Sequence, residues 1–433
     1  MGSRQDDSQL NPLIERIFRN EHKHLVSVLT RIFGPHNLAL AEDVVQESFM
    51  AALTHWQLHG LPDNPSAWLM RTGRNRAVDA IRKTRTQVSY AHDLTMYLES
   101  EYTLSRTVQE AFDRTEINDD LLRMIFMCCR PEISTENSVT LILKTLLGLS
   151  VSSVARALLT QVSTINKRLL RVRKHLQSVR FDVPEPVHLN GALEAVHTSL
   201  YLMFNEGAYS TNHEPIRQEL CREALYLVER LTQARHAHNS ETVALSALMC
   251  FHMARLNTRM DTNGKLIPLD QQDRTQWDRD MIDRGLQALA HSTRMERNVA
   301  SRFHLEAAIA SRHCTALSFA DTDWRSICKL YNRLLDVAPS TLVALNRAVA
   351  ISYLHGPGMA IDVVKQLEED QALPKHNNSI QAVLAVLYQR IGETEVAQTY
   401  QEQAIAMAAT DHERDLLQMQ IDRARSLSHV RPE

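Results

Sequence analysis

The chain has 433 residues, of which 44% are hydrophobic, and its 48 basic and 51 acidic side chains give a net charge of only -3. This size and composition exclude a wholly disordered chain and allow two to four domains with hydrophobic cores. Because Gly is scarce, at 12 residues, and few β-branched runs alternate with period two, the composition predicts an all-α fold.

The six cysteines are scattered, apart from the adjacent Cys128 and Cys129, and are too few for a disulfide framework in so long a chain. They predict free thiols in a cytoplasmic protein. The polar start predicts no signal peptide, and without a run of 18 apolar residues we expect no membrane span. The 20 histidines show no metal-ligand spacing, so no metal or cofactor is expected.

Residues 11–57 predict two amphipathic helices, broken near Gly34-Pro35. The second helix is expected to bury one stripe, made of Ala41, Val45, Ser48, Phe49 and Ala52. The opposite stripe, at i, i+3, i+4 and i+7, is polar and contains Asp43, Gln46, Glu47 and Met50. Taken alone, such a stripe is most often solvated surface.

A loop with two prolines, residues 58–66, precedes a helix predicted from about Pro65 to about Thr86. The inner face of this helix consists of apolar or small residues. Its outer face is basic and amide-bearing, with Arg71, Arg74, Asn75, Asp79, Arg82 and Arg85. Such a face beside a Pro-rich loop suits a single-stranded nucleic-acid backbone with a flipped base. Residues 87–118 are polar and predict a linker.

Charge divides the chain. Residues 1–181 hold 23 basic and 19 acidic side chains, a net of +4, whereas residues 182–433 hold 25 and 32, a net of -7. Between Asn137 and Phe181 there are eight Lys or Arg residues and no Asp or Glu. This asymmetry predicts that only the front part of the chain contacts a polyanion.

The acid-free stretch predicts two helices around a tight turn at residues 159–161. The first runs from an N-cap at Ser150 to about Leu158 and buries Val151, Val154, Ala155 and Leu158. The second buries Val162, Ile165, Leu169, Val172 and Leu176. Its other face carries Ser163, Lys167, Arg171 and Lys174, flanked by Thr164, Arg168 and Arg173. The pattern predicts a helix-turn-helix whose second helix enters the major groove of DNA.

The segment VPEP at 183–186 predicts a domain boundary, and helices follow to about residue 427. Near the end, tetratricopeptide-like spacing is shown by Leu384, Ala385, Tyr388, Gly392, Ala397 and Ala404. A weaker copy has Ala348 and Ala360, 37 residues earlier. Two degenerate copies can also arise from any antiparallel helix pairs.

Two motifs resemble a known family. AEDVVQESF followed by AWLMRTGRNRAVDAIRK resembles region 2 of the extracytoplasmic-function sigma factors, and LLGLSVSSVARALLTQVSTINKRLLRVRK resembles their region 4. DDLLRMIFMCCRP, LYLMFNEGAYS, LIPLDQQDRTQWDR and ADTDWRSICKLYNRLLDVAPSTLVALNRAVA resemble a subfamily with a long C-terminal extension, so the resemblance covers nearly the whole chain. That subfamily usually has His after the two cysteines. Arg130 stands there instead, so the cysteine pair is predicted to be core.

The resemblance implies a protein without catalysis that binds core RNA polymerase and directs it to promoter DNA. It implies polymerase contacts by Asp43, Gln46 and Glu47. It implies that the -10 element is read and melted by Asn64, Arg71, Arg74, Asn75, Arg82 and Lys83. It implies that the -35 element is read by Ser163, Thr164, Lys167, Arg168, Arg171 and Lys174. Two tethered DNA modules suit two separated promoter boxes.

The predicted domains are a region 2-like domain (1–88), a linker (89–118), a region 4-like helix-turn-helix domain (119–180), a helical extension (186–320) and tetratricopeptide-like repeats (321–427). The extension is expected to contact regions 2 and 4 and gate polymerase access, to dock a partner, or only to stabilise the fold. The alternative function is a one-component helix-turn-helix regulator with a helical sensor domain, which would not bind core polymerase.

Two short motifs in the extension could suggest a pocket, but helix caps explain them better. Gly207, after Asn205-Glu206, is expected to be a helix C-cap. Asp270 is expected to be an N-cap with Asp273 at the N3 position.

Overall fold

The structure is a computed structural model that describes residues 38–85, 120–177, 189–208, 217–261, 267–370 and 378–408, except 131, 235–236 and 296–299, with parts of 14–30 and 414–419. The all-α prediction is confirmed, since these residues contain helices and no β-strand. The chain forms two compact units, Met1–Leu202 with Gln233–Ala237, and Met203–Thr232 with His238–Glu433. No described helix is both long and apolar enough to cross a membrane.

The first unit begins with a packed helix pair, α2 (Leu38–His59) and α3 (Pro65–Arg85). Trp56 of α2 and Leu69 of α3 are fully buried between them. Gly73 of α3 leaves room for the Leu25 side chain, which comes from the segment before α2, because a Cβ at Gly73 would lie 3.3 Å from it. The predicted extent of α3 is close to the observed one, whereas the predicted break at Gly34-Pro35 and the linker at 89–118 lie outside the described residues.

A second group of helices in this unit comprises α6 (Asp120–Cys128), α7 (Thr135–Leu141), α8 (Val151–Ala157) and α9 (Val162–Gln177). α7 continues into a π-helical segment, η2 (Ile142–Leu146), and both α7 and α8 pack on α9. Cys128 and Cys129 are core residues, as predicted. Burial raises the pKa of Cys128 to about 12, so its thiol stays protonated and unreactive.

The second unit is built around a buried helix. α10 (Leu189–Ala208) belongs to the first unit up to Leu202 and enters the second unit at Met203, where α11 (Gln218–Gln233), α12 (Ser240–Met253), α13 (Arg279–Met295) and α14 (Arg302–Thr315) follow. α12 is apolar on every side, and all ten residues from Thr242 to Phe251 are buried where it packs on α13 and α14. The predicted boundary at 183–186 lies outside the described residues, and the five-domain division stays a prediction.

Short 3-10 turns, η4 (Leu256–Thr258), η5 (Leu269–Gln271) and η6 (Arg274–Gln276), carry a buried polar cluster centred on Arg274. The Arg274 guanidinium donates to the carbonyl oxygens of His313 and Ala316, at 2.8 and 3.0 Å, and stacks 5.0 Å from the Trp277 ring. The Trp277 indole in turn donates to Thr258 Oγ1 at 2.9 Å. The motif is therefore a structural centre of the extension.

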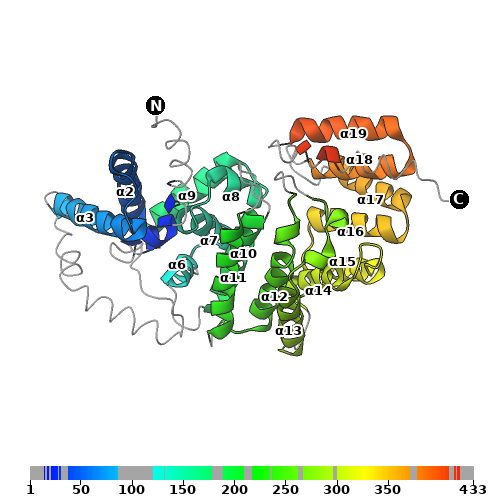
Figure 1. The fold of residues 1–433 in the computed structure, drawn as a ribbon, viewed down its shortest axis with the longest axis horizontal. Helices are drawn as coiled ribbons and strands as arrows, with labels where there is room; N and C mark the ends of the chain where they lie inside the picture. The colour runs from blue at the N-terminus through cyan, green and yellow to red at the C-terminus, as the bar shows by residue number, and fades with distance from the viewer. Residues whose placement is uncertain are drawn as a thin grey trace. The chain divides into compact units, whose positions relative to one another are not determined.

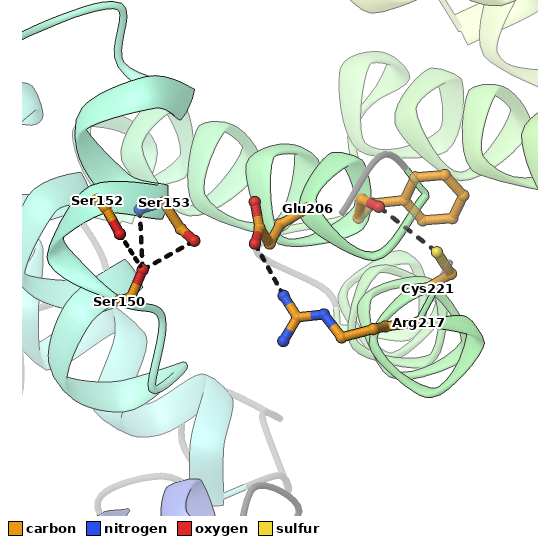
Figure 2. Close-up of polar contacts among 7 residues, drawn as sticks. Ser150, Ser152, Ser153, Glu206, Arg217 and Cys221 are labelled. Atoms are coloured by element: carbon orange, nitrogen blue, oxygen red, sulfur yellow. Dashed lines mark hydrogen bonds and ion pairs between the residues drawn. The ribbon is translucent and has the colours of Figure 1, made fainter. Parts of the chain in front are cut away.

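Both predicted caps in the extension are wrong in detail. Gly207 lies inside α10, where a Cβ would come within 2.8 Å of the Cys221 sulfur, so close helix packing explains this glycine. Beside it, the Glu206 carboxylate and the Arg217 guanidinium form a buried ion pair at 3.0 Å (Figure 2). Asp273, rather than Asp270, is the N-cap of η6 and accepts from the Thr275 backbone N–H.

The unit ends in five helices, α15 (Trp324–Val337), α16 (Thr341–Leu354), α17 (Pro357–Glu369), α18 (Ser379–Ile391) and α19 (Thr394–Met407). Each packs on the next, so they lie side by side in chain order, from yellow to orange in Figure 1. Small residues are fully buried at the contacts, namely Ala348, Ala360, Ala385, Ala397 and Ala404. Gly392 ends α18 in the left-handed conformation, as predicted.

Candidate nucleic-acid interface

The polar face of α2 lies on the surface, as its periodicity predicted. Asp43, Gln46 and Glu47 are exposed, and Met50 beside them is 65% exposed. Phe49 is half-buried and stacks on Phe18 with the ring centroids 4.4 Å apart. The opposite stripe is core. The α2 face thus presents carboxylates, an amide and one apolar side chain to solvent.

The Glu47 carboxylate is not alone on this surface. It accepts a hydrogen bond at 2.8 Å from the Arg76 guanidinium of α3, where the Glu47 side chain is 62% and the Arg76 side chain 36% exposed. Exposed ion pairs contribute only about 0–1 kcal/mol, so this one can exchange for a contact with another molecule at little cost.

The outer face of α3 displays Arg71, Arg74 and Asn75, all exposed. Asn64 has a structural role, because its side-chain oxygen accepts from the Ala67 N–H at 2.9 Å and so caps the helix before Pro65. Arg82 and Lys83 continue the same helix, but their side chains lie outside the described residues.

The turn between α8 and α9 follows the predicted pattern. Ser150 caps α8, and its Oγ accepts from the Ser153 N–H at 3.0 Å and contacts the hydroxyls of Ser152 and Ser153 (Figure 2). The turn then contains Leu159 at φ 49°, the one non-glycine residue with positive φ among those the structure describes. The side chain of Leu159 is 39% exposed.

α9 separates an apolar face from a basic one. Ile165, Leu169 and Val172 are buried as predicted. The prediction that Val162 is buried is wrong. Val162 is the first residue of α9 and is 46% exposed. The side chain of Leu176 lies outside the described residues.

The opposite face of α9 is open to solvent. It carries the predicted Ser163, Lys167, Arg171 and Lys174, with Thr164 half-buried beside them and with the exposed Asn166 and Leu170. Lys167, Arg171 and Lys174 are exposed, and none of them pairs with a carboxylate of the residues that the structure describes.

Two other arginines of α9 are engaged by acids that sequence patterns did not indicate. The Arg168 guanidinium donates to the Glu136 carboxylate of α7 at 2.6 Å, and only 20% of the Arg168 side chain is exposed. The Arg173 guanidinium donates to Glu42 of α2 at 2.5 Å. The partners are 32 and 131 residues apart, beyond any helical repeat, so no local signal could have revealed them.

Two segments of the sequence match models of known protein families. Residues 17–87 match the family model of sigma-70 region 2, and residues 192–293 match a family of unknown function, DUF6596. No solved structure matches the chain.

Similar proteins extend these matches. An uncharacterized protein of Rhizobium meliloti (strain 1021) is 32% identical over 401 residues, or 92% of each chain. The probable ECF RNA polymerase sigma factor SigI of Mycobacterium tuberculosis, in strains CDC 1551 / Oshkosh and ATCC 25618 / H37Rv, is 23% identical over 173 residues, which are 40% of this chain and 57% of SigI. The chain therefore belongs to the extracytoplasmic-function sigma factors, in the group that carries a long C-terminal extension.

Proposed function

We propose that the protein binds core RNA polymerase through the polar face of α2 and directs it to promoters that are read at two separate elements by α3 and α9. The observation that carries this proposal is the combination of a matched region 2 with the open basic face of α9 farther along the same chain. Sigma factors act by binding, so no catalysis of its own is expected. A one-component regulator would have no use for region 2, which argues against that alternative.

The polymerase contact is assigned to Asp43, Gln46 and Glu47 because they form one exposed stripe of α2. Met50 continues this stripe and adds an apolar contact. An acidic stripe with an apolar end suits a basic, partly apolar partner surface.

The -10 element is assigned to α3. Arg71, Arg74 and Asn75 share its exposed face, where guanidinium groups neutralise phosphates and the amide can hydrogen-bond an unpaired base. Asn64 positions this face by capping the helix. Arg82 and Lys83, farther along α3, are included in the assignment as expected from the resemblance.

The -35 element is assigned to α9. Ser163, Thr164, Lys167, Arg171 and Lys174 supply hydroxyl donors and cations without nearby carboxylates, which suits insertion into the major groove. Arg168 belongs to the same helix but is held by Glu136 at the edge of this face.

Transcription in vitro with purified core polymerase and a promoter library tests the proposal. Wild-type protein should associate with core polymerase and initiate from a defined subset of promoters. Asp43→Asn with Glu47→Gln should weaken association with core, and Lys167→Ala with Arg171→Ala should weaken promoter choice. Arg325→Ala, an exposed arginine of α15, is the control and should change neither. Failure of the wild type to associate with core polymerase would contradict the proposal.

We also propose that the extension regulates this activity by contacting regions 2 and 4. The net charge of -7 on residues 182–433, against +4 on residues 1–181, supports an attraction between them. A chain ending at Ala208, the last residue of α10, should therefore differ from the full chain in promoter output. Equal promoter output per folded molecule from both chains would rule out regulation by the extension. The extension would then serve to stabilise the fold or to dock a partner, and the helix pairs α16–α17 and α18–α19 offer a repeat-like surface for docking.

A further inference from the structure

One acidic residue borders the basic face of α9. The acid-free stretch starts immediately after Glu136, and folding brings Glu136 back to the middle of that stretch. Glu136 lies in the first turn of α7, and its carboxylate accepts from Nη2 of Arg168 at 2.6 Å. α7 packs directly on α9, so the two backbones hold the pair in place.

The two side chains of this pair differ in their surroundings. The Glu136 side chain is 71% exposed, whereas the Arg168 side chain is 20% exposed. An ion pair with so exposed an acid is screened by water and adds little to stability. Its main consequence is geometric, because it restricts a long side chain that would otherwise sample many rotamers.

Restriction of a guanidinium matters for reading DNA. Arg168 has five N–H donors, and Glu136 engages Nη2, which leaves the other edges of the planar group available. A fixed planar edge can donate two parallel hydrogen bonds to O6 and N7 of guanine. The lysines of the exposed face, Lys167 and Lys174, are flexible point charges that suit phosphates.

We propose that Glu136 is a positioning residue that holds Arg168 for bidentate recognition of one guanine in the element read by α9, and thereby sets the base preference at that position without touching DNA. This inference rests on the proposed function, since it requires that α9 reads promoter DNA. It divides the basic residues of α9 into an oriented arginine that specifies sequence and free cations that supply affinity.

The test uses the full chain with core RNA polymerase and a randomised DNA duplex library, from which bound sequences are selected and counted. Glu136→Ala should reduce the preference for guanine at one position about ten-fold, with the other positions unchanged. Glu136→Gln keeps an acceptor oxygen and should retain part of that preference. Glu132→Ala, an exposed acid four residues earlier with no ion pair among the described residues, should match the wild type.

A second measurement separates positioning from charge. In the salt dependence of binding to a selected duplex, Lys167→Ala removes a phosphate contact and should lower the slope by about one unit, whereas Glu136→Ala and Arg168→Ala alter a base contact and should leave the slope nearly unchanged. The exchange Glu136→Arg with Arg168→Glu restores an ion pair between α7 and α9 and should leave guanine unrecognised. If the pair served stability alone, this exchange would read the wild-type sequence.

The outcomes distinguish the inference from the function beneath it. A wild type that selects no sequence contradicts the proposed function and, with it, this inference. A wild type that selects a sequence whose preferences all survive in Glu136→Ala overturns only the role of Glu136.

Discussion

The basic helix α9 and the loop around Arg274 contain the same kind of side chain in opposite surroundings. In α9, Lys167, Arg171 and Lys174 face solvent. In the extension, Arg274 is 5% exposed, and its donors are used by His313, Ala316 and Thr322. An arginine in a motif therefore indicates binding only where burial leaves its donors available, and otherwise it indicates architecture.

The largest contrast is expected from the same substitution in the two regions. Arg274→Ala leaves buried carbonyl oxygens without donors and removes a ring contact, so it should cost about 3 kcal/mol or more of stability. Arg171→Ala should change stability by less than about 0.5 kcal/mol but lower the salt slope of DNA binding by about one unit. Calorimetry and binding titrations check both variants, and a stable Arg274→Ala protein would break the comparison.

A second contrast concerns two glycines of α10. Gly207→Ala places a Cβ 2.8 Å from the Cys221 sulfur and 3.0 Å from the Arg217 carbonyl oxygen, so overpacking should cost about 1–3 kcal/mol. Gly191 lies in the same helix, but a Cβ there would have no atom within 4 Å, so Gly191→Ala should stabilise the protein by about 0.5–1 kcal/mol. Thermal unfolding measures both, and equal shifts would show that helix propensity rather than packing decides.

A third contrast sets the buried His197 of α10 against the surface of the molecule. Burial lowers the pKa of His197 to about 4. Below pH 6.5 the unfolded state therefore binds a proton that the folded state does not, and stability should fall by about 1.4 kcal/mol per pH unit as the pH drops toward 4. Urea unfolding at pH 7, 6 and 5 should show a shallower pH dependence for His197→Gln. His59→Gln, at the exposed end of α2, controls for the exchange of a histidine for glutamine outside the core.

The smallest effect is expected in the turn before α9. Leu159 has a left-handed backbone, which costs a leucine about 1 kcal/mol and a glycine nothing. Leu159→Gly also raises the entropy of the unfolded chain, which offsets part of this gain, so the folded state should be stabilised by about 0.5 kcal/mol. Leu170→Gly, at a 71% exposed position within α9, should instead lose about 1 kcal/mol. Chemical denaturation resolves the two signs, and a destabilised Leu159→Gly would mean that the leucine side chain makes a needed contact.

Local periodicity predicted what depends on neighbours within one or two turns. The polar face of α2 and the buried stripe of α9 follow from spacings of three, four and seven residues, because these positions share one side of a helix. The start of α3 and the cap of α8 follow from residue type, namely from Pro65 and Ser150. The same reasoning failed for Val162, the first residue of α9, which continues the apolar spacing but is 46% exposed.

The sequence by itself determined that this protein is helical and that a run without acids lies between Asn137 and Phe181. Only the tertiary structure decided that Glu136 and Glu42 bind Arg168 and Arg173, and that Arg274 is buried. The physical reason is that ion pairing and burial depend on distances between helices, which packing sets and which spacing along one helix does not encode.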